Sequence, residues 1–115
     1  SPRDPQAFVF HYHIGLSRLV ANGWIHNEAV AEAYEVASRY PNATYVTHFA
    51  TACANAELGR MADAAHHLEM TKSKTDQFSL KVFKERWAFY PWASDFTDAN
   101  EGLLEKLVEL GLPRE

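Results

Sequence analysis

Six histidines are the side chains of this chain that could most readily bind a metal ion or move a proton near neutral pH. A zinc site built on one helix face takes ligands four residues apart, and no two of the histidines have that spacing. Asp63 and His67 do have it, but two ligands do not complete a zinc site. We therefore expect no metal site, and no cofactor, among the six: His11, His13, His26, His48, His66 and His67.

The only cysteine, Cys53, lies among alanines in the middle of a predicted helix. A reactive thiol needs access to solvent and a lowered pKa, so an inert, packed side chain is the interpretation we favour. The sequence has no Gly-rich phosphate loop ending in Gly-Lys-Ser/Thr, no Gly-x-Ser-x-Gly elbow and no His-Glu-x-x-His motif. We expect no catalytic residues, and an enzyme remains the remote alternative.

Composition narrows the class of protein further. The 115 residues are 47% hydrophobic and 13% aromatic, which favours one folded domain over disorder. A net charge of −4 argues against binding nucleic acid. No run of 18 apolar residues is present, so no membrane partner is expected, and a single cysteine fits the reducing cytoplasm. Residues 71–90 carry five basic and two acidic side chains. This segment is either a solvated helix surface or a contact for an acidic partner.

Helical patterns run through the whole chain, and no segment indicates a strand. The first helix begins near Pro5 and ends at Gly23. The last begins at Asp98, which forms a capping-box pattern with Glu101, and is closed by Gly111. Between them we predict helices over residues 25–39, 44–58, 61–71 and 77–90.

A period of 36 residues connects these helices. The same spacing of 36 residues separates four positions: Pro5, Pro41, Gln77 and Pro113. It also separates Gly23 from Gly59. Fixed periods of 20–50 residues are typical of solenoids. We therefore predict an all-α, right-handed solenoid of three antiparallel helix hairpins. It would form one domain over 1–115. Because the period is already present at Pro5, we expect the chain to be part of a longer parent chain. The predicted repeats are 8–41, 45–78 and 79–112.

The best repeat, 45–78, resembles the tetratricopeptide repeat. Ala52 and Ala64 occupy the small positions of its two helices, Gly59 the turn, and Leu68 the large packing position. Asn55, Thr71 and Asp76 depart from the usual tyrosine, alanine and proline. In 8–41 the pattern is met by Gly15, Gly23, Ala29 and Pro41, whereas 79–112 matches only in phase and helix content.

The loop phrases Ser-Pro-Arg-Asp-Pro at the start and Gly-Leu-Pro near the end are similar to the C-terminal repeat region of bacterial multidomain regulators. In those proteins repeats follow a nucleotidyl-cyclase domain or a winged-helix DNA-binding domain. The resemblance implies a regulatory or scaffolding arm for protein–protein interaction, in some cases within transcription regulation. Its partner would be a protein or peptide segment, or a domain of the same parent chain.

In such repeats the first helix of each hairpin lines a concave groove. The Lys, Arg and Asn side chains that clamp a peptide carboxylate are absent from the matching positions, so an apolar peptide or amphipathic helix suits the groove better. Alternatively, the rings there simply pack against the next hairpin. The candidate groove residues are His13, Ser17, Phe49, Cys53, Phe83 and Trp87.

Self-association is the second hypothesis. If the first helix lacks a neighbour, Phe8, Phe10 and Tyr12 would be exposed and could pair two copies in an isologous homodimer. A dense aromatic run near the end either closes the core or offers Trp92 or Phe96 to a partner.

Overall fold

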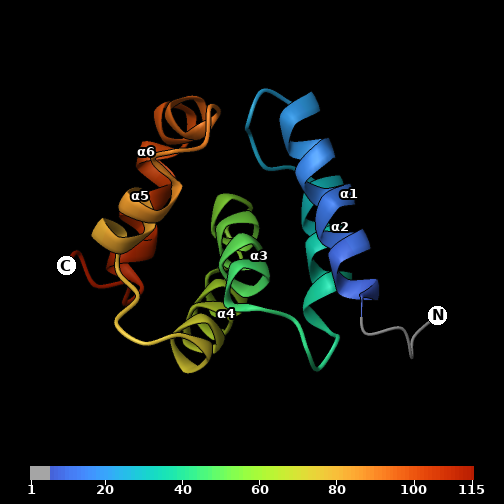
Figure 1. Cartoon of the computed structure of the whole chain (residues 1–115), viewed down its shortest axis with the longest axis horizontal. Coiled ribbons are helices and arrows are strands. Elements are labelled where there is room, and N and C mark those ends of the chain that lie inside the picture. Colours follow the sequence, from blue (N-terminus) through green and yellow to red (C-terminus); the bar gives the residue numbers. More distant parts are fainter. Residues whose placement is uncertain (1–5) are drawn as a thin grey trace.

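The computed structural model describes residues 6–115, and within them every regular element is a helix. The prediction of an all-α fold with six helices is therefore confirmed over this range, as Figure 1 shows. Pro5 and the interpretation of residues 1–5 as a loop between repeats lie outside the described residues. The helices are α1 (Ala7–Ala21), α2 (Glu28–Ser38), α3 (Tyr45–Glu57), α4 (Met61–Lys74), α5 (Leu80–Trp87) and α6 (Ala93–Glu109).

The first four helices form two hairpins, α1–α2 and α3–α4, which pack against each other through α2 and α3 (Figure 1). Gly23 and Gly59 have positive φ after α1 and α3, a conformation that glycine adopts without steric cost. Asn27 caps α2, its side-chain oxygen accepting a hydrogen bond from the Val30 amide. These local signals place the turns where the sequence predicts them.

The third pair of helices packs differently. Contacts between α5 and α6 are sparse, and α6 lies mainly against α3, where Leu103, Leu104 and Leu107 are buried. The chain end holds α5 in place, because the Leu80 amide donates to the Pro113 carbonyl at 2.8 Å. These contacts do not confirm the predicted solenoid of three equivalent hairpins.

The two ends of the helical arch meet. Asn100 of α6 donates a hydrogen bond from Nδ2 to the Trp24 carbonyl at 2.8 Å, and the Trp24 and Trp92 rings stack with centroids 5.4 Å apart. Figure 1 shows the beginning of α6 beside the α1–α2 turn. The described residues consequently form a globule of 37 × 30 × 29 Å, with the arch closed on itself.

Two helix boundaries in the last third differ from the prediction. Helix α5 is shorter than 77–90, because it begins after Ser79, whose Oγ accepts from the Val82 amide. Helix α6 begins at Ala93, and Asp98 lies inside it instead of capping it. Asn100 has non-helical angles (φ −121°, ψ 17°), so α6 is kinked two residues beyond the predicted start.

Across residues 6–115 no helix combines the length and apolar character that crossing a bilayer requires.

Candidate interaction groove

A hollow lined mainly by aromatic side chains lies between α1, the start of α3 and the turn between α5 and α6. It measures about 390 Å³ and is open to solvent. We call it the aromatic groove. Its lining brings together residues that are far apart in the sequence, chiefly Phe8, Tyr12, His13, Trp87, Tyr90 and Trp92.

The elements around the groove fix its rings by direct contact. Phe8 and Tyr12 are four residues apart on α1, so they lie on one face of the helix. The Tyr90 amide donates to the Trp87 carbonyl at 3.0 Å, which tightens the turn after α5. The Tyr90 ring then stacks on Trp92 with centroids 5.1 Å apart. The groove is therefore built by packing of aromatic side chains on two sides.

Behind the aromatic groove lies a much smaller cavity of about 40 Å³, which we call the inner cavity. Tyr12, Trp87 and Trp92 line both spaces. A volume of this size holds one or two water molecules and no larger ligand. The inner cavity is thus the deeper and narrower neighbour of the groove.

Three of the predicted groove residues lie in the core around the inner cavity. Phe49, Cys53 and Phe83 are at most 5% exposed, and the two phenylalanine rings contact each other with centroids 4.9 Å apart. Burial raises the pKa of the Cys53 thiol well above its usual value, which keeps the sulfur protonated. The structure therefore places these side chains in packing contacts with no direct path to solvent.

The other predicted residues are divided between the groove and the open surface. His13 is exposed at the rim of the aromatic groove and Trp87 lines it, whereas Ser17 is exposed and outside its lining. Phe8 and Tyr12, predicted for self-association, point into the groove, but Phe10 is 65% exposed and lies outside the lining.

Sequence reasoning did not place Tyr90 in the groove, because it is the last residue of the predicted helix 77–90, whereas α5 ends at Trp87 and Tyr90 lies in the turn after it. Leu16 and Val46 were also missed. The spacing of Leu16 gives a signal, since it is four residues after Tyr12 on the same helix face.

The chemistry of the groove is that of a binding surface. Burial, aided by the nearby Tyr90, raises the pKa of the Tyr12 phenol to about 12, so the hydroxyl stays neutral and is a poor base. His13 is the only lining residue whose side chain can carry charge near neutral pH. An uncharged aromatic surface of this kind suits apolar side chains.

Two buried nitrogen atoms beside the inner cavity have no hydrogen-bond partner among the described residues: His26 Nδ1 and Trp87 Nε1. His26 is 4% exposed. Burial lowers its pKa to about 4, and a hydrogen bond with Asn100 opposes this only in part, so the ring is neutral. Buried polar atoms normally have hydrogen-bond partners, so two unpaired nitrogens beside one cavity are unusual.

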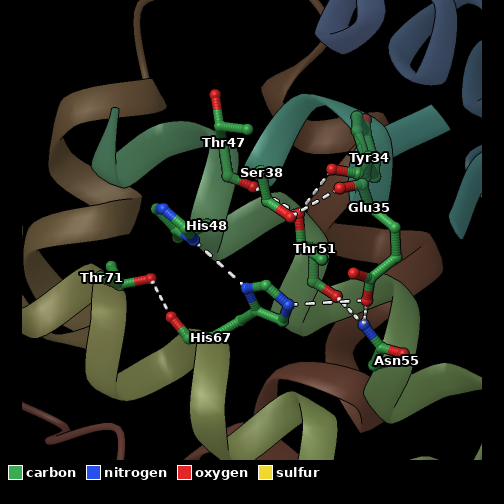
Figure 2. A network of polar contacts seen from close by, with 9 residues as sticks. All are labelled: Tyr34, Glu35, Ser38, Thr47, His48, Thr51, Asn55, His67 and Thr71. Carbon is green, nitrogen blue, oxygen red and sulfur yellow. Dashed lines mark hydrogen bonds and ion pairs between the residues drawn. The ribbon is translucent and has the colours of Figure 1, made fainter. Parts of the chain in front are cut away.

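A second cluster of polar side chains lies between α2, α3 and α4, as Figure 2 shows. His48 Nδ1 and His67 Nδ1 are 3.2 Å apart, and His67 Nε2 is 3.5 Å from a carboxylate oxygen of Glu35. The same oxygen accepts a hydrogen bond from Asn55 at 2.8 Å. This cluster links three helices, and we call it the histidine network.

The histidine network is arranged for structure more than for catalysis. Thr51 donates to the Thr47 carbonyl at 2.8 Å, and Thr71 to the His67 carbonyl at the same distance, so both hydroxyls are already used (Figure 2). Within residues 6–115 no three His, Cys, Asp or Glu side chains gather as metal ligands would. The cluster presents two imidazoles and one carboxylate, and its threonine hydroxyls donate to backbone carbonyls.

Comparison with known proteins finds no matching family model, no similar curated protein and no similar solved structure. The resemblance to the tetratricopeptide repeat stays a prediction.

Proposed function

We propose that this chain is a protein–protein interaction module whose aromatic groove binds an apolar peptide segment. The observation that carries the proposal is the open, ring-lined hollow of about 390 Å³ with one ionisable residue, His13, in its lining. Aromatic side chains such as Trp87 and Tyr90 provide large contact areas at little cost in side-chain entropy. A helical peptide with apolar residues three or four positions apart would fill such a groove.

The charge of the two segments that contribute groove residues supports a partner with acidic flanks. Helix α1 carries Arg18 and no acidic residue, and residues 80–92 carry three basic side chains against Glu85. These segments therefore hold four basic residues and one acidic residue in a chain whose net charge is −4. Complementary charge would speed the encounter and orient the peptide.

Selection from a displayed library of random 16-residue peptides tests the proposal. We expect enriched sequences to share apolar or aromatic residues at helical spacing, flanked by Asp or Glu. In fluorescence polarisation, His13→Glu should weaken the selected peptides by about tenfold, because it adds a like charge at the rim.

Ser17→Glu is the matched control, since Ser17 is exposed on the same helix but outside the groove lining. Its affinity should stay within about twofold of the parent. Equal losses in both variants, or a library that enriches no peptide, would count against the groove.

Self-association is a second candidate function, favoured by two exposed rings. Phe10 is 65% and Phe89 76% exposed, so both rings are accessible to a second copy of the chain. Sedimentation should then show a dimer that Phe10→Ser dissociates, and a monomer at high concentration would reject this candidate.

We also propose that the hairpins α1–α2 and α3–α4 are two tetratricopeptide-like repeats in right-handed order. Their support is the resemblance of the sequence together with the packing of α2 on α3. We propose further that the module is an arm of a larger bacterial cytoplasmic regulator. Only the resemblance of its loop sequences supports this role.

A further inference from the structure

Two departures from regular backbone geometry and two unpaired side-chain nitrogens lie close together where the arch closes. Trp24 has a φ of 67°, in the left-handed region that residues with side chains rarely adopt. Asn100 interrupts the helical angles of α6. His26 Nδ1 and Trp87 Nε1 are buried without hydrogen-bond partners. Strained and unsatisfied groups that gather at one place point to a segment with a second conformation.

The segment concerned is residues 88–99, the turn after α5 and the first part of α6, which we call the lid. Trp92 and Phe96 of the lid form one wall of the inner cavity, and Cys53 of α3 lies in the lining with them. The kink at Asn100 separates the lid from the later part of α6, which is anchored by Leu103, Leu104 and Leu107 in the core. The kink therefore divides α6 into the lid and a later part held in the core, and Phe96 of the lid also packs against Phe83 of α5.

Ring contacts and one side-chain amide hold the lid against the α1–α2 turn, and they include Phe96 against His26 with centroids 6.2 Å apart. Trp92 stacks on Trp24 with centroids 5.4 Å apart, and Phe96 meets the Trp24 ring edge to face at 6.2 Å. Asn100 Nδ2 donates both to the Trp24 carbonyl at 2.8 Å and to the Phe96 carbonyl at 2.9 Å. One amide group thus ties the kink of α6 to the strained residue on the opposite hairpin.

We propose that residues 88–99 are a lid over the inner cavity, latched by the contact of Trp24 with Asn100 and Trp92, and that the lid opens without unfolding of the other helices. Opening widens the inner cavity toward the aromatic groove, because Trp92 of the lid lines both spaces with Tyr12 and Trp87. It also exposes the unpaired nitrogens of His26 and Trp87 to water, which offsets part of the cost of separating the rings. The inference concerns the free chain and does not depend on a peptide partner.

Cys53 provides a direct probe, since it is the only cysteine, is 1% exposed and lies beneath the lid. Its labelling by a thiol reagent can be followed under native conditions at increasing urea concentration. If the lid opens locally, labelling at low urea should be nearly independent of urea and faster than global unfolding allows. Asn100→Ala should accelerate this labelling by about tenfold.

The chain offers a closely matched control in Asn55. Its side-chain amide likewise donates to the carbonyl four residues earlier, at 2.9 Å, and to a group on another helix, Glu35, at 2.8 Å. Asn55→Ala should accelerate labelling only as far as it lowers global stability. If Asn100→Ala does not fold, Trp92→Phe weakens the same latch and keeps an aromatic ring in place.

The lid is rejected if Cys53 labelling follows the urea dependence of global unfolding in the parent and in both asparagine variants. It is also rejected if Asn55→Ala and Asn100→Ala accelerate labelling equally at equal stability. Labelling that is fast, independent of urea and specifically increased by Asn100→Ala supports it.

Discussion

At the scale of single residues, the histidine network limits the pH range of the fold. His48 and His67 are buried with their Nδ1 atoms 3.2 Å apart, so one ring donates and the other accepts. If the His48 Nδ1–H donates, His67 is left with an Nε2–H that faces Glu35 at 3.5 Å. Protonation of both rings would place two positive charges side by side in a partly desolvated site.

The pKa values of both rings follow from this arrangement. Burial, with repulsion from His67, Lys74 and His66 and partial compensation by Glu35, lowers the pKa of His48 to about 4. Burial also lowers the pKa of His67, opposed by attraction to Glu35 and Asp63. His26 beside the inner cavity has a pKa of about 4 as well.

We predict that stability is lost on acidification between about pH 6.5 and pH 4. In that window the unfolded chain binds protons that the folded chain does not, so the free energy of unfolding falls as the pH falls. His48→Gln should flatten this dependence by about 1–2 kcal/mol, less than the full shift because water still screens the ring. Urea unfolding at pH 4.5 and 7.5 measures the difference.

His13→Gln is the control, because this imidazole is exposed and is not among the groups that shift the pKa of His48 or His67. Its pH dependence should match that of the parent. A parent chain equally stable at both pH values, or a His48→Gln variant with an unchanged slope, would contradict the assignment.

Sequence reasoning could not find the histidine network, because its members lie on three helices and His48 and His67 are 19 residues apart. Spacing along one helix, the test used for metal ligands, has no bearing on contacts across a helix pair. Asn55 was identified only as a departure from the repeat pattern. The structure shows the use of that departure, since its amide donates to Glu35 of the preceding hairpin.

At the scale of helices, the crossing of α1 and α2 depends on one glycine. A Cβ added to Gly15 would lie 2.5 Å from two carbon atoms of the Tyr34 ring, closer than packed atoms allow. Tyr34 is 2% exposed and also packs against Tyr12, so its ring has little room to move.

We predict that Gly15→Ala lowers the free energy of unfolding by about 1–3 kcal/mol through overpacking, despite the better helix propensity of alanine. Gly102→Ala is the opposite case, because nothing lies near its added Cβ inside α6. That substitution should raise stability by about 0.5–1 kcal/mol. Urea unfolding of the two variants should therefore show opposite signs, and equal signs would refute the crossing argument.

The first four helices could be predicted from the sequence because their ends carry local signals, such as Gly23 and Gly59 with positive φ. The start of α6 could not. The capping pattern at Asp98 lies inside a helix that begins five residues earlier, and burial of Phe96 at 8% exposure accompanies that earlier start. Tertiary packing here outweighs the local preference.

At the scale of the whole molecule, the predicted period describes an array, whereas the contacts describe a closed arch. The contact that closes it joins residues 24 and 100, which no repeat pattern relates. The same closure explains why two of the residues predicted to line a groove are buried. Phe49 and Phe83, which would line the inner curve of an open array, are packed against the rings of the lid and α5.

Closure also depends on the last residues of the chain. Helix α5 has only eight residues, too few for a stable helix without tertiary support. The Pro113 and Arg114 carbonyls accept hydrogen bonds from the amides of Leu80 and Lys81, at 2.8 and 2.9 Å. Leu112 beside them is 1% exposed and belongs to the core.

We predict that removal of residues 112–115 lowers the free energy of unfolding by about 3–5 kcal/mol, the sum of one buried leucine and two backbone hydrogen bonds. Amide exchange should rise first in α5, because its initial amides lose their acceptors, while α3 and α4 keep most of their protection. Removal of the exposed Glu115 alone should leave the unfolding midpoint unchanged. If the longer truncation unfolds like the parent, the chain end is not what holds α5 in the arch.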